Sequence, residues 1–375
     1  MIRFLMIIFI SLFLSSLSFA ADCRNKGECI SCHKEYASVL QSKMATKADE
    51  KEFIKHSLNM FDTEFGNKNC SGCHVSSCKD CHKENSDGSV KKPQVSDCLV
   101  CHNDVYTGAE YAGQGLREDN ERYKRGPQFM GSHYMQMLPD VHYELGITCG
   151  DCHSMANITG KEKARSCLSC HKYNTDIIDH SIKGHDKLEC VSCHGAWQPM
   201  ELGTFYIRTR ESDFRQYFDG IRELNDEYLK SSFMRVNEVP ILAIDNETGK
   251  YTPIKPAFIT FTTDIYRNYV VGIENRPLSN RWKTTTAHTV RRETPLCTSC
   301  HGNHRRFMLE KDDVLQPDKD GLPFKSFYNS QGFTLDGGRF VTEDEMKKIN
   351  GKSTEYVKKY FQKMEQVRGL INNSQ

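Results

Sequence analysis

Residues 133–195 read HYMQMLPDVHYELGITCGDCHSMANITGKEKARSCLSCHKYNTDIIDHSIKGHDKLECVSCHG. Three Cys-x-x-Cys-His units lie in this stretch, and they begin at Cys149, Cys167 and Cys190. Four further histidines are interleaved with them: His133, His142, His180 and His185. A unit of five residues is short enough to form one helical turn, which would bring both sulfurs and the imidazole to one place.

The same unit occurs eight times along the chain, and we number the copies as motifs 1 to 8. Their cysteines are Cys29, Cys32, Cys70, Cys73, Cys78, Cys81, Cys98, Cys101, Cys149, Cys152, Cys167, Cys170, Cys190, Cys193, Cys297 and Cys300. Their histidines are His33, His74, His82, His102, His153, His171, His194 and His301. Cys-x-x-Cys-His is the attachment signature of a c-type haem. The sequence therefore predicts eight covalently bound haem c groups, with these histidines as the proximal iron ligands.

Two other uses of paired cysteines fit this pattern less well. Disulfides are common in exported chains, but a disulfide gives no reason for a histidine after every pair. Zinc sites also use Cys-x-x-Cys pairs, but they do not repeat the adjoining histidine eight times. We therefore favour haem over both alternatives.

The first twenty residues resemble a signal peptide. Arg3 is followed by an apolar run, and Ser18-Phe19-Ala20 is a small-x-small cleavage sequence. We expect cleavage after Ala20 and export to the periplasm, with an extracellular or outer-surface location as the alternative. A retained N-terminal anchor is the other interpretation of this segment.

The charge balance excludes one class of partner. The formal net charge is +1, and it falls to 0 when Arg3 is removed with the leader. Because there is no excess of basic residues, we expect no nucleic-acid partner. No later run is long and apolar enough to predict a transmembrane span once the leader is cleaved.

Motif density determines the predicted fold class. Motifs 1 to 7 occupy residues 29–194, which leaves about 24 residues per haem. Such a segment has too few side chains for an ordinary core, so porphyrins would replace it. We expect a mainly α protein with little regular structure, wrapped around a haem array. The predicted divisions are a signal peptide (1–20), a seven-haem region (21–195), a haem-free α+β insert (196–290), an eighth haem site (291–310) and a C-terminal loop and helix (311–375).

The small insert has recognisable elements. Ser212 can cap a helix whose apolar residues continue at helical spacing to Tyr228. Val239–Ile244 and Phe258–Ile265 are predicted strands, and a turn at 245–249 follows the first of them.

The C-terminal segment ends in a predicted helix. Thr342 and Glu345 form a capping box, and one apolar helix face follows. That face contains Val357, Tyr360, Phe361, Met364 and Val367. We expect the final helix to pack against the haem region, and dimerisation through it is the alternative.

Seven histidines remain outside the motifs, and we expect them to be distal iron ligands. They are His56, His133, His142, His180, His185, His288 and His304. For His304, a hydrogen bond to a haem propionate is the alternative role. Seven distal ligands for eight irons leave one haem short. That haem would be open or water-bound, or would take a methionine or a lysine as its sixth ligand.

Two further residues are candidates for chemistry at the haem that lacks a distal histidine. Lys124 lies in the charged segment 117–125, which is either a cationic lining for an anion or a solvated helix face. Cys23 is the cysteine left over from the eight pairs. A leftover thiol in an exported chain is inert, paired between chains or reactive.

The motifs together resemble an octahaem cytochrome c, and three stretches resemble the octahaem tetrathionate-reductase family. They are His180–Trp197 (HSIKGHDKLECVSCHGAW), the haem-poor Glu238–Ile265, and Ala287-His288 followed by the last motif. That family is similar in haem packing to hydroxylamine oxidoreductases and pentahaem nitrite reductases. The resemblance covers roughly residues 29–301. It implies mostly bis-histidine haems and one active haem with a lysine ligand.

This chain departs from the related groups in three ways. No motif ends in lysine, as the active-haem motif of the nitrite reductases does, and no widely spaced Cys…Cys-His motif is present, as in the octahaem sulfite reductases. The chain is also short for the group.

Two functions follow from the predicted cofactors. The first is an exported electron-transfer protein whose one non-bis-histidine haem reduces a small sulfur or nitrogen oxyanion. The second is a non-catalytic electron carrier or extracellular conduit with all haems six-coordinate. For both, the expected protein partners are redox proteins, either quinol-linked or small periplasmic cytochromes. The ligand deficit favours the first.

Overall fold

The computed structural model describes residues 29–30, 33–46, 62–65, 75–102, 108–116, 128–129, 132–218, 221–311, 326–351 and 354–373. Several predictions fall on residues outside these ranges. They are the signal peptide and the roles of Cys23, Cys32, His56, Cys70, Cys73, His74 and Lys124.

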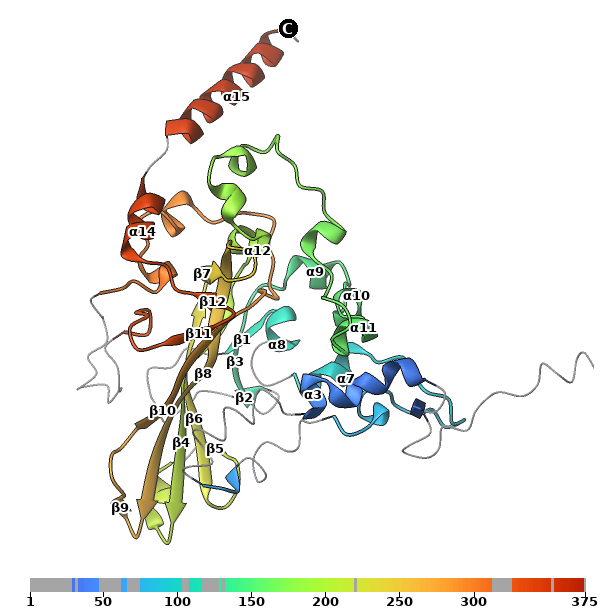
Figure 1. The fold of residues 1–375 in the computed structure, drawn as a ribbon, viewed down its shortest axis with the longest axis vertical. Coiled ribbons are helices and arrows are strands. Elements are labelled where there is room, and N and C mark those ends of the chain that lie inside the picture. Colours follow the sequence, from blue (N-terminus) through green and yellow to red (C-terminus); the bar gives the residue numbers. More distant parts are fainter. Residues whose placement is uncertain are drawn as a thin grey trace, which may run out of the picture.

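A large β-sheet dominates the described part of the chain (Figure 1). Its order is β11-β10-β8-β4-β6-β5, and β7, β9 and β12 pair at its margins to give nine strands. The bounds of these strands are β4 Gln198–Arg210, β5 Arg222–Glu223, β6 Tyr228–Asn237, β7 Ile241–Asp245, β8 Tyr251–Tyr266, β9 Tyr269–Val270, β10 Arg276–Thr284, β11 Thr334–Asp336 and β12 Gly338–Arg339. The prediction of a mainly α protein with a small α+β insert is therefore wrong.

Long strands explain why the sheet holds together without a haem core. β4 pairs antiparallel with β6 and parallel with β8, and β8 pairs antiparallel with β10. Since β8 is 16 residues long, its first part can pair with β7 while its second part pairs with β4. Aromatic and aliphatic side chains from these strands form the main core, which includes Phe205, Phe233 and Trp282.

The predicted helix after Ser212 is the clearest local error. Ser212 does cap a helix, because its hydroxyl accepts from the Phe214 N–H at 3.2 Å, but this 3-10 helix η7 ends at Tyr217. The helical spacing of the following apolar residues arises instead from a cluster that includes Phe214, Phe218 and Ile221 and covers one end of the sheet. Tertiary burial therefore outweighs the local periodicity.

Other local predictions are confirmed. β7 and β8 contain the two predicted strands and the predicted turn joins them, with Asp245 accepting from the N–H groups of Glu247 and Thr248. β7 pairs with Tyr251–Ile254, so β8 begins earlier than the predicted strand Phe258–Ile265. The capping box of Thr342 and Glu345 begins helix α14 (Glu343–Asn350). A final helix, α15 (Thr354–Asn373), follows it.

The expected packing of α15 is not observed in this chain. The helix projects away from the rest of the molecule (Figure 1), and its apolar face is exposed, with Phe361 at 65% and Val357 at 50% of full exposure. It touches the body through Lys359, whose Nζ donates to the carbonyl oxygen of Ser181 at 2.5 Å.

The haem motifs lie on short helical turns beside the sheet and at one end of it (Figure 1). The turns are η3 (Cys78–Asp80), α7 (Val95–Leu99), α10 (Cys149–Cys152), η4 (Cys167–Ser169), α12 (Cys190–His194) and η8 (Cys297–Ser299). The remaining short helices are η1 (Lys34–Gln41), α3 (Lys43–Thr46), α8 (Gly108–Tyr111), α9 (Val141–Glu144), α11 (Met155–Ile158), η5 (Ile178–Ser181), η6 (His185–Lys187) and η9 (Arg305–Phe307). A small separate sheet has the order β1-β3-β2, formed by β1 (Gln114–Leu116), β2 (Gln128–Phe129) and β3 (Ser132–Gln136).

Candidate haem-binding sites

Each described motif folds as the same tight turn. The N–H of the motif histidine donates to the carbonyl oxygen of the first cysteine, four residues earlier, at 2.8–2.9 Å in motifs 1, 3, 4, 5, 6 and 8. Motif 7 is itself the helix α12. This i to i−4 bond brings the two thiols and the imidazole of each motif together. The motif cysteines that the structure describes are unpaired thiols.

Side chains inside and before the motifs start these turns. In motif 5, Asp151 accepts from the Thr148 N–H at 2.7 Å and from its hydroxyl at 2.8 Å. These hydrogen bonds hold the pKa of Asp151 below its usual value. The same type of capping box involves Asp80 in motif 3. In motifs 3 and 5, the sequence therefore encodes the turn locally, through a carboxylate at the third motif position.

Three motif histidines face a second histidine from elsewhere in the chain. The ring centroids of His171 and His142 lie 6.1 Å apart. The corresponding distances are 6.2 Å for His194 and His180 and 6.4 Å for His153 and His288. In each pair one ring belongs to a motif and the other is a predicted distal ligand.

This spacing fits a metal ion held between two imidazoles. A ligating nitrogen lies about 2.0–2.1 Å from its metal, and its ring centroid lies roughly 1.2 Å further out. Two ligands on opposite sides therefore place their centroids about 6.4–6.6 Å apart. The observed 6.1–6.4 Å is close to this separation, and it also lies within the range of ordinary ring packing. The centroid distances of the three pairs therefore match the separation expected for two imidazoles on one metal ion.

The second ring nitrogen of many of these histidines is already engaged. The Nδ1 atoms of His153, His180 and His185 lie 2.7–2.9 Å from an oxygen acceptor, and His301 Nδ1 faces the carbonyl oxygen of Ile349. Nδ1 of His82 lies 3.1 Å from the Lys91 carbonyl oxygen. An acceptor at Nδ1 selects the tautomer whose Nε2 lone pair is available to a metal, and it fixes the ring orientation.

Neighbouring motifs lie close enough, in chain order, for their thiols to influence one another. Burial, and then the nearby Cys149, raise the pKa of the Cys98 thiol, so motifs 4 and 5 adjoin. A hydrogen bond to Cys167 lowers the pKa of Cys190 to about 6, which joins motifs 6 and 7.

Three further thiol interactions complete this run. In each, burial is the first cause and a thiol of the neighbouring motif the second cause of a raised thiol pKa. The pairs are Cys81 beside Cys98, Cys152 beside Cys170, and Cys193 beside Cys300. Motifs 3 to 8 therefore form one continuous series of neighbours.

One connecting segment ties the histidine pairs to the sheet. Residues 287–291 follow β10 and contain His288. The Val290 N–H donates to the buried carboxylate of Asp140, and the Arg291 N–H donates to the His194 carbonyl oxygen at 2.9 Å. Asp140 also caps α9, accepting from the His142 N–H at 2.7 Å. A single carboxylate therefore fixes the segments of two predicted distal ligands, His142 and His288.

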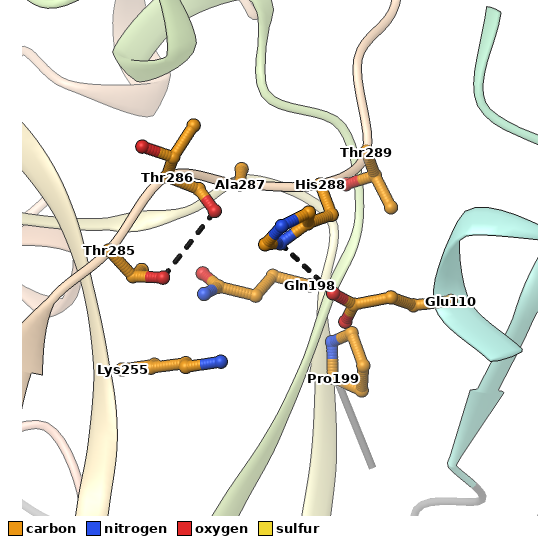
Figure 2. Close-up of a pocket in the computed structure, with 9 residues that line it drawn as sticks. All are labelled: Glu110, Gln198, Pro199, Lys255, Thr285, Thr286, Ala287, His288 and Thr289. Carbon is orange, nitrogen blue, oxygen red and sulfur yellow. Dashed lines mark hydrogen bonds and ion pairs between the residues drawn. The ribbon is translucent and has the colours of Figure 1, made fainter. Parts of the chain in front are cut away.

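A pocket lies beside His288 (Figure 2). It is a small pocket that opens to solvent, and the space of about 240 Å³ around it includes open solvent. Its lining residues are Glu110, Gln198, Pro199, Lys255, Thr285, Thr286, Ala287, His288 and Thr289. Oε1 of Glu110 lies 3.9 Å from Nδ1 of His288.

Burial governs the charges in this pocket. It raises the pKa of Glu110 to about 8, against the opposing charge of Lys255. It lowers the pKa of Lys255 to about 8 and, with the charge of Lys255, that of His288 to about 4. His288 is therefore neutral at pH 7, which is the form that binds a metal. Burial and the charges of His153 and Lys255 also lower the pKa of His102, which places motif 4 near the pocket.

The structure does not bring every predicted ligand to a partner. His185 and His304 lie on or beside short helices, η6 and η9, and His133 lies in β3. The side chain of His133 is outside the described part of the structure. The distal role stays a prediction for these three, as it does for the histidines that face a motif histidine.

Sequence reasoning missed four residues that the structure places among the motifs: Glu110, Gln198, Lys255 and Arg306. The signal for Lys255 is a lone charge between prolines in the otherwise apolar run Thr252–Ile259. Arg306 is 2% exposed, and its guanidinium donates to the carbonyl oxygens of Ser192, Pro240 and Ser299. It therefore links the turns of motifs 7 and 8, and no local pattern predicts this.

Comparison with known proteins adds no relative: no family model, no curated protein and no solved structure matches this chain. Within the described ranges, no three His, Cys, Asp or Glu side chains converge as a group that could hold a metal ion by themselves. No helix among the described residues is long and apolar enough to cross a membrane.

Proposed function

We propose that this chain is an exported octahaem cytochrome c that transfers electrons, and that one haem without a distal histidine reduces a small sulfur or nitrogen oxyanion. The observation that carries the proposal is the set of three histidine pairs at 6.1–6.4 Å, each with one motif histidine. Disulfide formation gives no reason for this spacing. The proposed relationship is to the octahaem tetrathionate-reductase group, and the proposed location is the periplasm or outer surface.

The chain's own residues would hold the cofactors in a defined way. Each motif thiol adds across a porphyrin vinyl group, forming a C–S bond while its hydrogen goes to the neighbouring carbon. The motif histidine would ligate the iron, and His142, His180 and His288 would supply the second ligand in motifs 6, 7 and 5. Haem c bound at these motifs would supply one-electron redox chemistry along the series.

The contiguity of motifs 3 to 8 supports electron transfer over a long path. It equally suits the second candidate, a non-catalytic conduit with all haems six-coordinate. The pocket beside His288 favours the reductase, because Lys255 would offset the charge of a bound anion close to motifs 4 and 5.

Two measurements test the proposal. Intact-mass analysis of the holoprotein should exceed the mature chain by eight haems, and each missing haem would remove one motif from the proposal. After reduction, carbon monoxide should bind about one haem in eight if one iron lacks a strong sixth ligand. A holoprotein that binds no carbon monoxide and reduces none of tetrathionate, nitrite and hydroxylamine would contradict the reductase and leave the conduit.

A further inference from the structure

The pocket beside His288 contains a buried acceptor without a partner. Gln198 is 5% exposed, and its Oε1 has no hydrogen-bond partner in the described structure. A buried amide oxygen left unpaired costs free energy, so such an atom indicates a missing donor. Figure 2 shows the Gln198 amide pointing away from Glu110, toward Thr285 and above the Lys255 ammonium, and all of these residues line the pocket.

A cationic donor faces the same space from another strand. Gln198 begins β4, whereas Lys255 lies in β8, and its Nζ points toward the Gln198 amide in Figure 2. A ligand that contacts the ammonium and also satisfies Gln198 Oε1 must present an oxygen to the first and a hydrogen to the second.

From this pairing of groups we propose that the pocket binds a small oxyanion that carries one proton. A single negative charge would be offset by Lys255, and the one O–H would donate to Gln198. Thr285 flanks the site; its hydroxyl lies 3.4 Å from the Thr286 carbonyl oxygen, which leaves its own oxygen as an acceptor. Anion binding in this pocket does not depend on the proposed function. The inference rests on the proposed function only where it treats the bound anion as the substrate that haems at the neighbouring motifs would reduce.

Two probe anions separate the effect of the proton on binding from the effects of charge and shape. Hydrogen carbonate and nitrate are both small, trigonal and singly charged, but only hydrogen carbonate carries a proton. Calorimetric titration of the oxidised holoprotein should show hydrogen carbonate binding about tenfold or more tightly than nitrate, because nitrate leaves Gln198 Oε1 unpaired. Equal affinity for the two anions, or no binding of either, would overturn the proposal.

Variants assign the effect to individual groups. Gln198→Leu should remove the preference and leave the two anions with equal affinity. Lys255→Gln should weaken both by a similar factor of about ten or more. Lys283 is the matched control, since it pairs with Lys255 across β10 and β8 but does not line the pocket. Lys283→Gln should change both affinities much less than Lys255→Gln does and should keep the preference for hydrogen carbonate.

The outcomes distinguish this inference from the haem proposal. Haem content and the absorption spectrum are measured on every variant, so a chain without eight haems counts against the proposed function alone. If Lys255→Gln does not fold, Gln198→Leu decides the question by itself. A preference for hydrogen carbonate that persists in Gln198→Leu would contradict the proposed site.

Discussion

Removing His180 should leave one haem iron, and no other, without its sixth ligand. Its ring centroid lies 6.2 Å from that of His194, the motif 7 histidine. Alanine has no nitrogen donor, so His180→Ala would leave the iron of motif 7 without its sixth ligand. With eight motifs in the chain, carbon monoxide binding after reduction should rise by about one-eighth of the total haem. The increment is the same whether the unaltered protein binds one carbon monoxide or none.

A second pair tests whether the assignments are independent. His142 pairs with His171 of motif 6, so His142→Ala should open a different haem, and the double variant should gain about two-eighths. Tyr173→Phe is the control: its ring stacks on His180 at 4.7 Å, and its hydroxyl donates to the His180 carbonyl oxygen. It keeps the ligand and should add no carbon monoxide site. If the double variant gains no more than either single variant, the assignment of separate pairs is wrong.

Three further predictions concern stability. Arg306→Leu removes the donor to three carbonyl oxygens and should destabilise the fold by about 3–5 kcal/mol, measured by circular dichroism during urea unfolding; a loss below about 1 kcal/mol would contradict the linking role. Hydrogen bonds from Arg339 lower the pKa of Glu345 to about 2 from 4.5, so this stabilisation is present above pH 4.5 and is lost as the pH falls toward 2. Since Arg339 is half-exposed, Arg339→Gln should cost only about 0.5 kcal/mol at pH 7 and nothing near pH 2, and a pH-independent cost would refute the ion pair. Deleting residues 352–375 should change the unfolding free energy of the remainder by less than about 1 kcal/mol, because the apolar face of α15 is exposed; a larger loss, with a lower mass in sedimentation, would indicate the dimerising helix instead.

The motif turns could be predicted because each depends on five consecutive residues. The bond from the His153 N–H to the Cys149 carbonyl oxygen closes within one helical turn, and Asp151 and Thr148 cap it from adjacent positions. The hairpin at Asp245 and the capping box at Thr342 are equally local. In all of these, the hydrogen-bonding partners are neighbours in the chain.

The fold class could not be predicted from motif density. Counting residues per haem suggested that the chain had no room for a conventional core, but the haem-poor residues build one in a nine-stranded sheet. The apolar residues after Ser212 also match a helix, because strand alternation and helical spacing are hard to separate over short runs. Burial of Phe218 and Ile221 against the sheet decides between them.

By itself, the sequence determined the number of motifs, the residues that form each turn and the supply of seven further histidines. It did so because these features depend on residue type and on spacing within a few positions. Only the tertiary structure decided that His288 pairs with His153, 135 residues earlier, and that Lys255 and Gln198 meet in one pocket. Such pairings depend on strand register and on the long connections around the sheet, for which the five-residue motif carries no information.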